Sequence, residues 1–429
     1  MKVLLIGSGG REHALAAGMI KDKTLTKLYV APGNPGIEQL ASLEKIECVP
    51  IASDNFDELV IFSINNQIDL VVIGPEKPLV AGLADKLREK SIKVFGPSAI
   101  AAQIEGSKDF AKKVMQKAGV PTAESFTCEN ENEIDSALAY FSKFNQPFVV
   151  KDDGLAAGKG VVVTQSKDEA KRHALSCQRV VIEKYLAGPE FSLFGISDGK
   201  KVVGMHPAQD FKRVFDNDEG PNTGGMGSYS PLDWLPKDIV AKVEKEILQP
   251  IISTLNEMGM PFIGLLYAGL VLTDEGIKVI EFNARFGDPE TQSLIPRLNT
   301  PLVQLFDQAA SGELASEIKL DWSNEYAVSV VLASEGYPEN PVLNREIELP
   351  ATTYFDSQST FIFHSGTNID SGKLVSSGGR TLTISALGEN LNEARARAYQ
   401  VLKQIRLEKS HYRTDIAARV MNHWENKGE

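Results

Sequence analysis

Apolar positions in the first hundred residues fall into short runs that predict buried strands with helices between them. The runs of strand length are residues 2–6, 28–31, 69–73 and 94–95. Runs with helical spacing separate them at 13–20 and 79–90. Strands that alternate with helices form a parallel sheet, and ligands bind beyond the carboxyl ends of its strands. We therefore expect a parallel α/β domain with a binding site at the start of the chain.

The rest of the chain mixes strands and helices in a less regular order. Ser107 has the position of an N-cap for a helix that runs to residue 118. The strands expected next are residues 148–151, 161–164, 180–183, 264–272 and 277–285, and the helices are 167–176 and 236–259. Beyond about residue 321 a β-rich segment begins and ends in a helix at 391–405, which predicts a separate α+β domain.

The strand at 277–285 carries the most informative polar side chains. Alternation places Glu281, Asn283 and Arg285 on one side if the strand persists that far. Carboxylate and amide oxygens are hard ligands suited to Mg²⁺, and a guanidinium suits a carboxylate or phosphate. A surface ion pair at a strand end is the alternative. Oxygen ligands for a cation, followed two residues later by a guanidinium that can bind an anion, favour a binding site over a surface ion pair.

A glycine-rich turn follows the first strand and predicts a second anion site. Gly9, Gly10 and Arg11 precede a helix, where backbone N–H groups can approach a phosphate. A dinucleotide site is disfavoured because that motif requires glycine where Glu12 stands. The alternative to a phosphate site is a tight structural turn with an exposed arginine. Glu76 follows the 69–73 strand and is a candidate for contact with a substrate hydroxyl or amine.

A hairpin of small residues at 152–160 suits the phosphates of a nucleotide. Lys151 precedes it, and Lys159 lies near its end among three glycines and two alanines. It is not a Walker loop, because Gly160 replaces Ser or Thr and a strand follows. Lys108 lies in the first turn of its helix, where a cation needs a nearby anion or solvent.

Two further segments suit a small substrate and the rest of a nucleotide. The hinge after the 180–183 strand offers backbone groups to adenine, and Glu190 is placed to bind ribose hydroxyls. The run 220–227, which includes Gly224, consists almost entirely of backbone and suits close wrapping of a small substrate. It follows the polar segment that contains Asp210.

Composition bounds the class of protein. The 429 residues allow two to four domains, and a formal net charge of −12 argues against a general nucleic-acid binder. The sequence shows no apolar run of membrane-spanning length and no signal-peptide pattern. Three widely spaced cysteines suggest neither a disulfide framework nor a zinc site. We expect a cytoplasmic protein that does not bind membranes.

These motifs, taken together, resemble the phosphoribosylamine–glycine ligases, which are ATP-grasp enzymes of purine synthesis. The resemblance covers the whole chain and is carried by seven motifs. They are G-S-G-G-R-E-H-A at 7–14, A-P-G-N-P-G at 31–36, G-P-E at 74–76, E-G-S-K at 105–108, D-G-L-A-A-G-K-G at 153–160, G-P-N-T-G-G-M-G at 220–227 and E-F-N-A-R-F-G-D-P-E at 281–290. The last two are the most specific.

The resemblance implies a fold and a reaction. The fold is a Rossmann-like parallel N-terminal domain at 1–103, an ATP-grasp core at 104–320 with a small lid at about 121–187, and a C-terminal α+β domain at 321–429. The reaction joins glycine to 5-phosphoribosylamine through glycyl phosphate and gives glycinamide ribonucleotide, ADP and phosphate. The expected cofactor is Mg²⁺ or Mn²⁺, and the expected state is a monomer.

The resemblance also implies site residues. Arg285, Lys151 and Asp210 are the expected catalytic residues, and Glu281 and Asn283 the expected metal ligands. The residues expected to bind ATP are Lys108, Lys151, Lys159, Glu183, Lys184, Leu186 and Glu190. Those expected to bind the other substrates are Gly9, Gly10, Arg11, Glu76, Asp210, Gly224 and Arg285.

The sequence departs from the family pattern in three places. The loop at 176–179 is shorter than the usual glycine-rich loop, Asp152 replaces a small residue, and residues 267–269 lack the carboxylate that many ATP-grasp enzymes place there. The alternatives left open are another ATP-grasp ligase or carboxylase, a nicotinamide oxidoreductase and a non-catalytic nucleotide-binding regulator.

Overall fold

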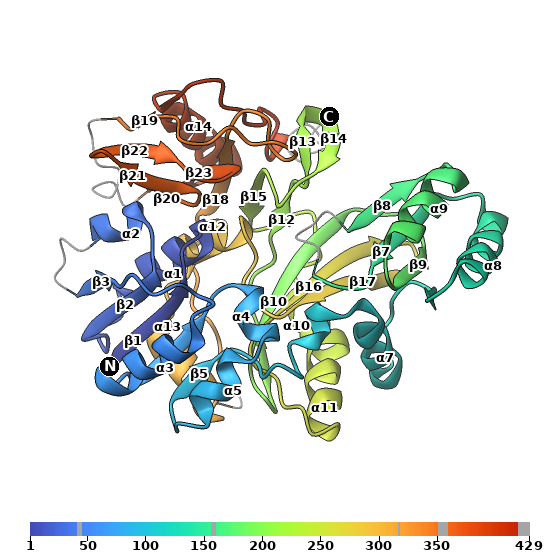
Figure 1. Cartoon of the computed structure of the whole chain (residues 1–429), viewed down its shortest axis with the longest axis horizontal. Helices are drawn as coiled ribbons and strands as arrows, with labels where there is room; N and C mark the ends of the chain where they lie inside the picture. The colour runs from blue at the N-terminus through green and yellow to red at the C-terminus, as the bar shows by residue number, and fades with distance from the viewer. Residues whose placement is uncertain (41–44, 156–159, 316–317, 351–358, 419–429) are drawn as a thin grey trace.

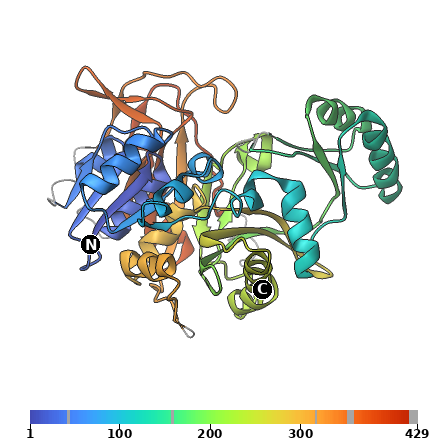
Figure 2. The same ribbon diagram turned by 60° about the horizontal axis from the view of Figure 1, so that its bottom comes forward.

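The computed structural model describes residues 1–40, 45–155, 160–315, 318–350 and 359–418. The chain forms a body of several sheets, with a smaller unit made of β6–β9, α8 and α9 projecting from one side (Figures 1 and 2). No helix within the described ranges is long and apolar enough to cross a membrane.

The N-terminal sheet is parallel throughout, as the sequence predicts, and its neighbouring strands at 2–7 and 70–73 are almost entirely buried. Its order is β3-β2-β1-β4-β5. The strands are β1 Lys2–Gly7, β2 Lys27–Pro32, β3 Ile46–Cys48, β4 Leu70–Ile73 and β5 Lys93–Phe95. The helices are α1 Gly10–Met19, α2 Pro35–Gln39, α3 Phe56–Asn65, α4 Glu76–Val80, α5 Leu83–Arg88 and α6 Gln103–Gly106.

The projecting unit, which we call the lid, is built on an antiparallel sheet of order β6-β9-β7-β8. Its strands are β6 Ser125–Cys128, β7 Phe148–Asp152, β8 Val161–Thr164 and β9 Val180–Lys184. Its helices are α8 Glu131–Phe141, η2 Ser142–Phe144 and α9 Lys167–Ser176. The helix α7, Lys108–Ala118, precedes the lid and is capped by the Ser107 side chain, as predicted.

A second antiparallel sheet of order β11-β10-β16-β17 lies at the centre of the molecule. The strands are β10 Glu190–Asp198, β11 Val202–Gly204, β16 Ile263–Thr273 and β17 Gly276–Asn283. The helices of this region are α10 Ile239–Val243, the π-helix η4 Glu244–Leu248, α11 Gln249–Glu257, α12 Glu290–Leu294, η5 Ile295–Arg297 and α13 Leu302–Ser311.

The C-terminal sheet contains strands from two distant parts of the chain. Its order is β12-β15-β18-β23-β20, so two strands from the middle of the chain extend a sheet of C-terminal strands. The strands are β12 Gln209–Asp210, β15 Gly227–Ser230, β18 Tyr326–Ala333, β20 Thr360–His364 and β23 Arg380–Gly388, and α14 Leu391–Leu402 packs on them. The remaining small elements are β13 Arg213–Phe215, η3 Asp216–Asp218, β14 Glu219–Asn222, β19 Ile347–Glu348, β21 Thr367–Asp370, β22 Lys373–Ser376 and β24 Arg406–Leu407.

Two helices expected to be continuous are interrupted. The helix expected at 79–90 is two short helices, α4 and α5, because Gly82 takes a left-handed conformation between them. The helix expected at 236–259 contains the π-helical turn η4, which ends two residues before Pro250. Proline has no N–H to donate, and its ring clashes with the carbonyl four residues earlier, so regular α-helical bonding cannot continue through this turn.

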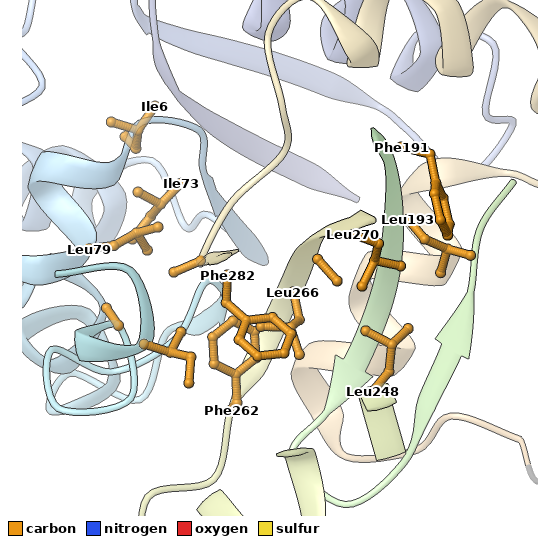
Figure 3. Close-up of a cluster of buried hydrophobic side chains, with 14 of the residues drawn as sticks. Ile6, Ile73, Leu79, Phe191, Leu193, Leu248, Phe262, Leu266, Leu270 and Phe282 are labelled. Atoms are coloured by element: carbon orange, nitrogen blue, oxygen red, sulfur yellow. The ribbon is translucent and has the colours of Figure 1, made fainter. Parts of the chain in front are cut away.

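One large apolar core connects the N-terminal domain to the central sheet. Ile6, Ile73 and Leu79 from the first domain belong to the same buried cluster as Phe262 and Phe282. Figure 3 shows these side chains on neighbouring elements, with Leu266 and Leu270 of β16 continuing the cluster. The packing fixes β17 relative to the carboxyl ends of the parallel strands.

Candidate active site

The predicted metal ligands lie at the end of β17, where one extra residue changes the register. The pairing with β16 shifts between Gly269 and Leu270, which leaves Ile280 without a partner of its own. Beyond this bulge Phe282 is buried in the core, while Glu281 and Asn283 are only partly buried. The two oxygen-bearing side chains therefore alternate with Phe282 on the opposite face, as predicted. The strand itself ends at Asn283, so Arg285 lies in the following turn.

Arg285 is held between two carboxylates of the N-terminal domain. Its Nη2 lies 3.0 Å from Glu105 Oε1 and its Nε 3.4 Å from Glu76 Oε2, while Nη1 donates to the Phe286 carbonyl. Among the described residues, Nε finds no hydrogen-bond acceptor despite this ion pair. Burial alone would lower the pKa of Arg285, but Glu105 and Glu76 raise it instead. The guanidinium therefore stays charged in this buried position.

Glu105 is a residue that the sequence analysis did not assign to the site. Its Oε2 accepts the Ala284 N–H at 2.7 Å, so one buried carboxylate fixes both the turn after β17 and the Arg285 side chain. Burial raises the pKa of Glu105, and Arg285 opposes that rise. The E-G-S-K motif was the only signal for this residue, because its partners lie some 180 positions away in the chain.

Lys151 is buried and paired inside the protein. Its Nζ lies 3.1 Å from Glu183 Oε2 and donates to the Ile280 carbonyl at 2.9 Å. Glu183, on the neighbouring strand β9, also lies 3.3 Å from Lys112 of α7. The structure thus brings two residues predicted to contact ATP, Lys151 and Glu183, next to the strand of the predicted metal ligands.

Lys108 is pinned to the base of the hairpin that follows β7. Its Nζ donates to the Gly154 carbonyl at 2.9 Å, while its N–H donates to Asp153 Oδ1 at 2.6 Å. The buried carboxylate of Asp153 also pairs with Arg179, the last residue of the short loop at 176–179. The N-terminus of α7 therefore has a protein anion next to it. Lys159 lies outside the described residues.

The hinge predicted to receive adenine is present as an irregular segment between β9 and β10. Lys184 ends β9, its N–H donates to the Glu124 carbonyl, and its Nζ lies 4.7 Å from the centre of the Phe144 ring. Leu186 is partly buried in the segment that follows. Glu190 begins β10 with a largely exposed side chain, 3.0 Å from Lys212.

Asp210 and Glu190 are two carboxylates that both lie close to Lys212. Lys212 Nζ lies 3.9 Å from Asp210 Oδ1 and 3.0 Å from Glu190 Oε2. Burial would lower the pKa of Lys212, yet Asp210 and Glu190 raise it well above its usual value. Burial, with the charge of Asp210, raises the pKa of the fully buried Glu290 to about 7. Glu290, for which the sequence predicts no role, also interacts electrostatically with Tyr267 of β16.

The residues predicted to form the first phosphate site are engaged by protein carboxylates. The Gly9 N–H donates to Glu12 Oε2 at 2.7 Å, and the Arg11 N–H to Asp288 Oδ2 at 3.3 Å. The Arg11 side chain is buried, with Nε 2.6 Å from Glu12 and Nη1 donating to the Phe286 carbonyl. A side chain on Gly10 would collide with Gln292 and Ser365. This turn therefore connects the first domain to the loop after β17.

The glycine-rich run at 220–227 packs against the same loop. Arg380 of β23 donates to the carbonyls of Gly224 and Asp288, at 2.5 and 2.6 Å. A Cβ on Gly224 would lie 3.0 Å from the Arg380 guanidinium. Arg380 therefore serves a structural role by joining the glycine-rich run to the turn after β17.

Gly225 cannot take a side chain without movement of the site. Its φ is +112°, and a Cβ would lie 2.4 Å from Cδ of Pro289. We expect Gly225→Ala to lower the free energy of unfolding by about 1–3 kcal/mol, measured by urea titration. Gly119→Ala is the matched control, because its φ is also positive but its Cβ would meet no atom within 4 Å. Equal losses in the two variants would contradict the argument from the contact with Pro289.

The end of β17 has donors that fit a hard divalent cation. Glu281 supplies a carboxylate and Asn283 an amide oxygen. Within the described ranges no three His, Cys, Asp or Glu side chains gather into a metal-holding group. Two protein donors match the way in which Mg²⁺ is usually held, by one or two protein groups plus phosphate oxygens and water.

Comparison with known proteins covers all three parts of the chain. The N, ATP-grasp (A) and C domains of phosphoribosylglycinamide synthetase match residues 1–105, 106–291 and 327–419. Phosphoribosylamine–glycine ligase of Streptomyces coelicolor is 51% identical over 422 residues, which cover 98% of this chain and 99% of that protein. The enzyme of Corynebacterium ammoniagenes is 48% identical, over 97% of each chain.

Solved structures agree with these matches. The crystal structure of phosphoribosylamine–glycine ligase from Thermotoga maritima gives a TM-score of 0.81 at 33% identity, covering 97% of this chain and 100% of that one. Biotin carboxylase from Campylobacter jejuni gives a TM-score of 0.71 at 15% identity, covering 96% and 92% of the two chains, which shows a shared fold. The predicted fold class, with its parallel N-terminal domain, ATP-grasp core and C-terminal domain, is confirmed. The residue boundaries chosen from the sequence stay predictions.

Proposed function

Because this chain belongs to the phosphoribosylglycinamide synthetase family, we propose that it joins glycine to 5-phosphoribosylamine in purine synthesis, with ATP converted to ADP and phosphate. The glycine carboxylate attacks the γ-phosphate of ATP and forms glycyl phosphate. The amine of phosphoribosylamine then attacks the glycyl carbonyl and displaces phosphate. The observation that carries the proposal is the meeting of Glu281, Asn283, Arg285 and Lys151 around one strand end.

In this reaction the protein acts mainly by positioning and by charge. Lys151 of β7, and Lys108, which donates to Gly154 in the hairpin after β7, are the cations that we assign to the ATP phosphates. Arg285 keeps its charge between Glu76 and Glu105, and its unsatisfied Nε is the donor that we assign to the reacting carboxylate. Mg²⁺, for which Mn²⁺ can substitute, would be held by Glu281 and Asn283 and would neutralise charge on the phosphate oxygens.

The remaining predicted residues are assigned to the other substrates and to adenine. The hinge of Lys184 and Leu186 receives adenine, and Glu190 the ribose. Asp210 and Gly224 border the side where phosphoribosylamine enters, together with Glu76. Gly9, Gly10 and Arg11 are assigned to this side through the backbone turn that they form. Glu12 and Asp288 already accept hydrogen bonds from Gly9 and Arg11.

The reaction is tested directly by omission of single substrates. ADP release measured with a coupled assay should require glycine, phosphoribosylamine and a divalent cation together. ADP release that proceeds without glycine would reject the assignment and favour another ATP-grasp ligase or carboxylase. A non-catalytic regulator would bind nucleotide but release no ADP under any combination.

The metal assignment predicts a selective effect of Glu281→Gln. Loss of one anionic oxygen should raise the Mg²⁺ concentration needed for half-maximal activity by roughly tenfold or more. The Michaelis constant for glycine should change by less, since Arg285 and not Glu281 contacts the carboxylate in our assignment. Separate titrations of Mg²⁺ and glycine measure the two effects. Lys278→Gln, on the same strand but in a surface pair with Glu275, is the control.

A further inference from the structure

A buried ion cluster lies behind the proposed nucleotide site and contains a lysine that the proposed function does not use. Glu183 of β9 bridges Lys151 of β7 and Lys112 of α7, at 3.1 and 3.3 Å. The exposed fractions are 4% for the Lys151 and Glu183 side chains and 12% for Lys112. Figure 1 shows α7 alongside β17, beneath the sheet that carries β7 and β9. Two ammonium groups and one carboxylate give this cluster a net charge of +1.

The net charge determines what the cluster can do for a nucleotide. If Lys112 were absent, Glu183 would neutralise the charge of Lys151. The electrostatic attraction between Lys151 and a phosphate would then be weak. We propose that Lys112 is a positioning residue for nucleotide binding: it satisfies Glu183, so that the charge of Lys151 remains available to the ATP phosphates. The inference rests on the proposed nucleotide site at Lys151.

Hydrogen bonds fix Lys112 in this position. Its Nζ donates to Thr122 Oγ1 at 2.9 Å and to the Ala123 carbonyl at 3.0 Å. The Thr122 hydroxyl donates in turn to the Val279 carbonyl of β17, next to the Ile280 carbonyl that Lys151 contacts. Both lysines are thus tied to the strand that carries Glu281. Rotation of Lys112 away from Glu183 would break three polar contacts.

The protonation state of Lys112 gives a second way to examine the cluster. Burial lowers the pKa of Lys112 to about 8, the charge of Lys151 acts in the same direction, and Glu183 opposes both. The ionisable groups that face it are Glu183 from β9 and Lys151 from β7. Other elements packed on α7 bring Glu105, Glu257, Lys278 and Glu281, and in the described part of the chain none of these forms an ion pair with Lys112. As pH rises through about 8, the cluster passes from +1 towards zero.

The experiment measures binding of MgADP by calorimetry to the full chain and to three variants. Lys112→Met removes the charge at similar length, Lys112→Arg keeps a charge that does not titrate, and Lys113→Met is the control. Lys113 neighbours Lys112, but its side chain is exposed and pairs with Asp109 of the same helix. At pH 7 we expect Lys112→Met to weaken MgADP binding about tenfold, with Lys112→Arg and Lys113→Met close to the wild type. The Michaelis constant for glycine should change less than twofold in every variant.

The pH profile separates positioning from a merely structural role. The affinity of the wild type for MgADP should decline between pH 7 and 9, as Lys112 loses its proton. The affinity of Lys112→Met and that of Lys112→Arg should not change over this range, because neither side chain titrates there. Unchanged affinity in Lys112→Met, or a decline that persists in Lys112→Arg, overturns the inference. If Lys112→Met does not fold, the comparison of wild type with Lys112→Arg still decides. A wild-type chain that fails to bind MgADP at all would instead reject the proposed function.

Discussion

Replacement of Arg285 by alanine should lower turnover by roughly 10²–10³. The guanidinium is the cation closest to the predicted metal ligands in sequence, and its Nε is a buried donor without an acceptor. The change also leaves Glu76 and the buried Glu105 without their ion-pair partner. Removal of one partner from a buried ion pair costs about 3–5 kcal/mol, so the variant should also unfold at a lower urea concentration.

Steady-state ADP release and urea titration measure these two effects separately. Arg285→Lys is the matched control, because it keeps the charge but loses the planar group that contacts both carboxylates. It should recover most of the stability and only part of the rate. A folded Arg285→Ala protein that turns over at the wild-type rate would contradict the role assigned to this side chain.

Replacement of Lys151 by methionine should lower kcat/KM for ATP by roughly 10²–10³, because a preorganised cation is lost from the transferring phosphate. The fold should survive, since Glu183 keeps Lys112 as a partner. Titration of ATP at saturating glycine measures the loss, and the melting temperature reports on the fold. Lys171→Met is the control, because Lys171 lies on α9 of the same lid and pairs at the surface with Glu131 and Asp135. A kcat/KM equal to that of the wild type would contradict the role of Lys151 in binding the ATP phosphates.

Local sequence patterns predicted the elements that depend on local rules. Four of the five parallel strands of the first domain contain apolar runs that the sequence predicts, and the Ser107 cap needs only its own helix. The strand β3 was not predicted, because its three residues carry Glu47 at the centre. The side of β17 that carries Glu281 and Asn283 also followed from alternation, although the bulge at Ile280 could not be foreseen. Such features are decided within a few residues of chain.

The unpredicted features depend on contacts between distant residues. Glu105 meets Ala284 across 179 positions, and Arg380 meets Gly224 across 156. No periodicity reveals such pairs, because the partners share no local pattern. The same holds for the strands β12 and β15, whose two and four residues are too short to show alternation. The motif resemblance pointed to these regions, and the contacts that unite them came only from the structure.

The sheet shared by β12, β15 and the C-terminal strands limits how this protein can be divided or recombined. A fragment cut before residue 326 would expose the whole edge of β15, with its unpaired N–H and C=O groups, to water or to other chains. Asp210 lies on β12, whose partner in the sheet is this exposed strand. The C-terminal quarter therefore cannot be exchanged between relatives as an independent module unless β12 and β15 are exchanged with it.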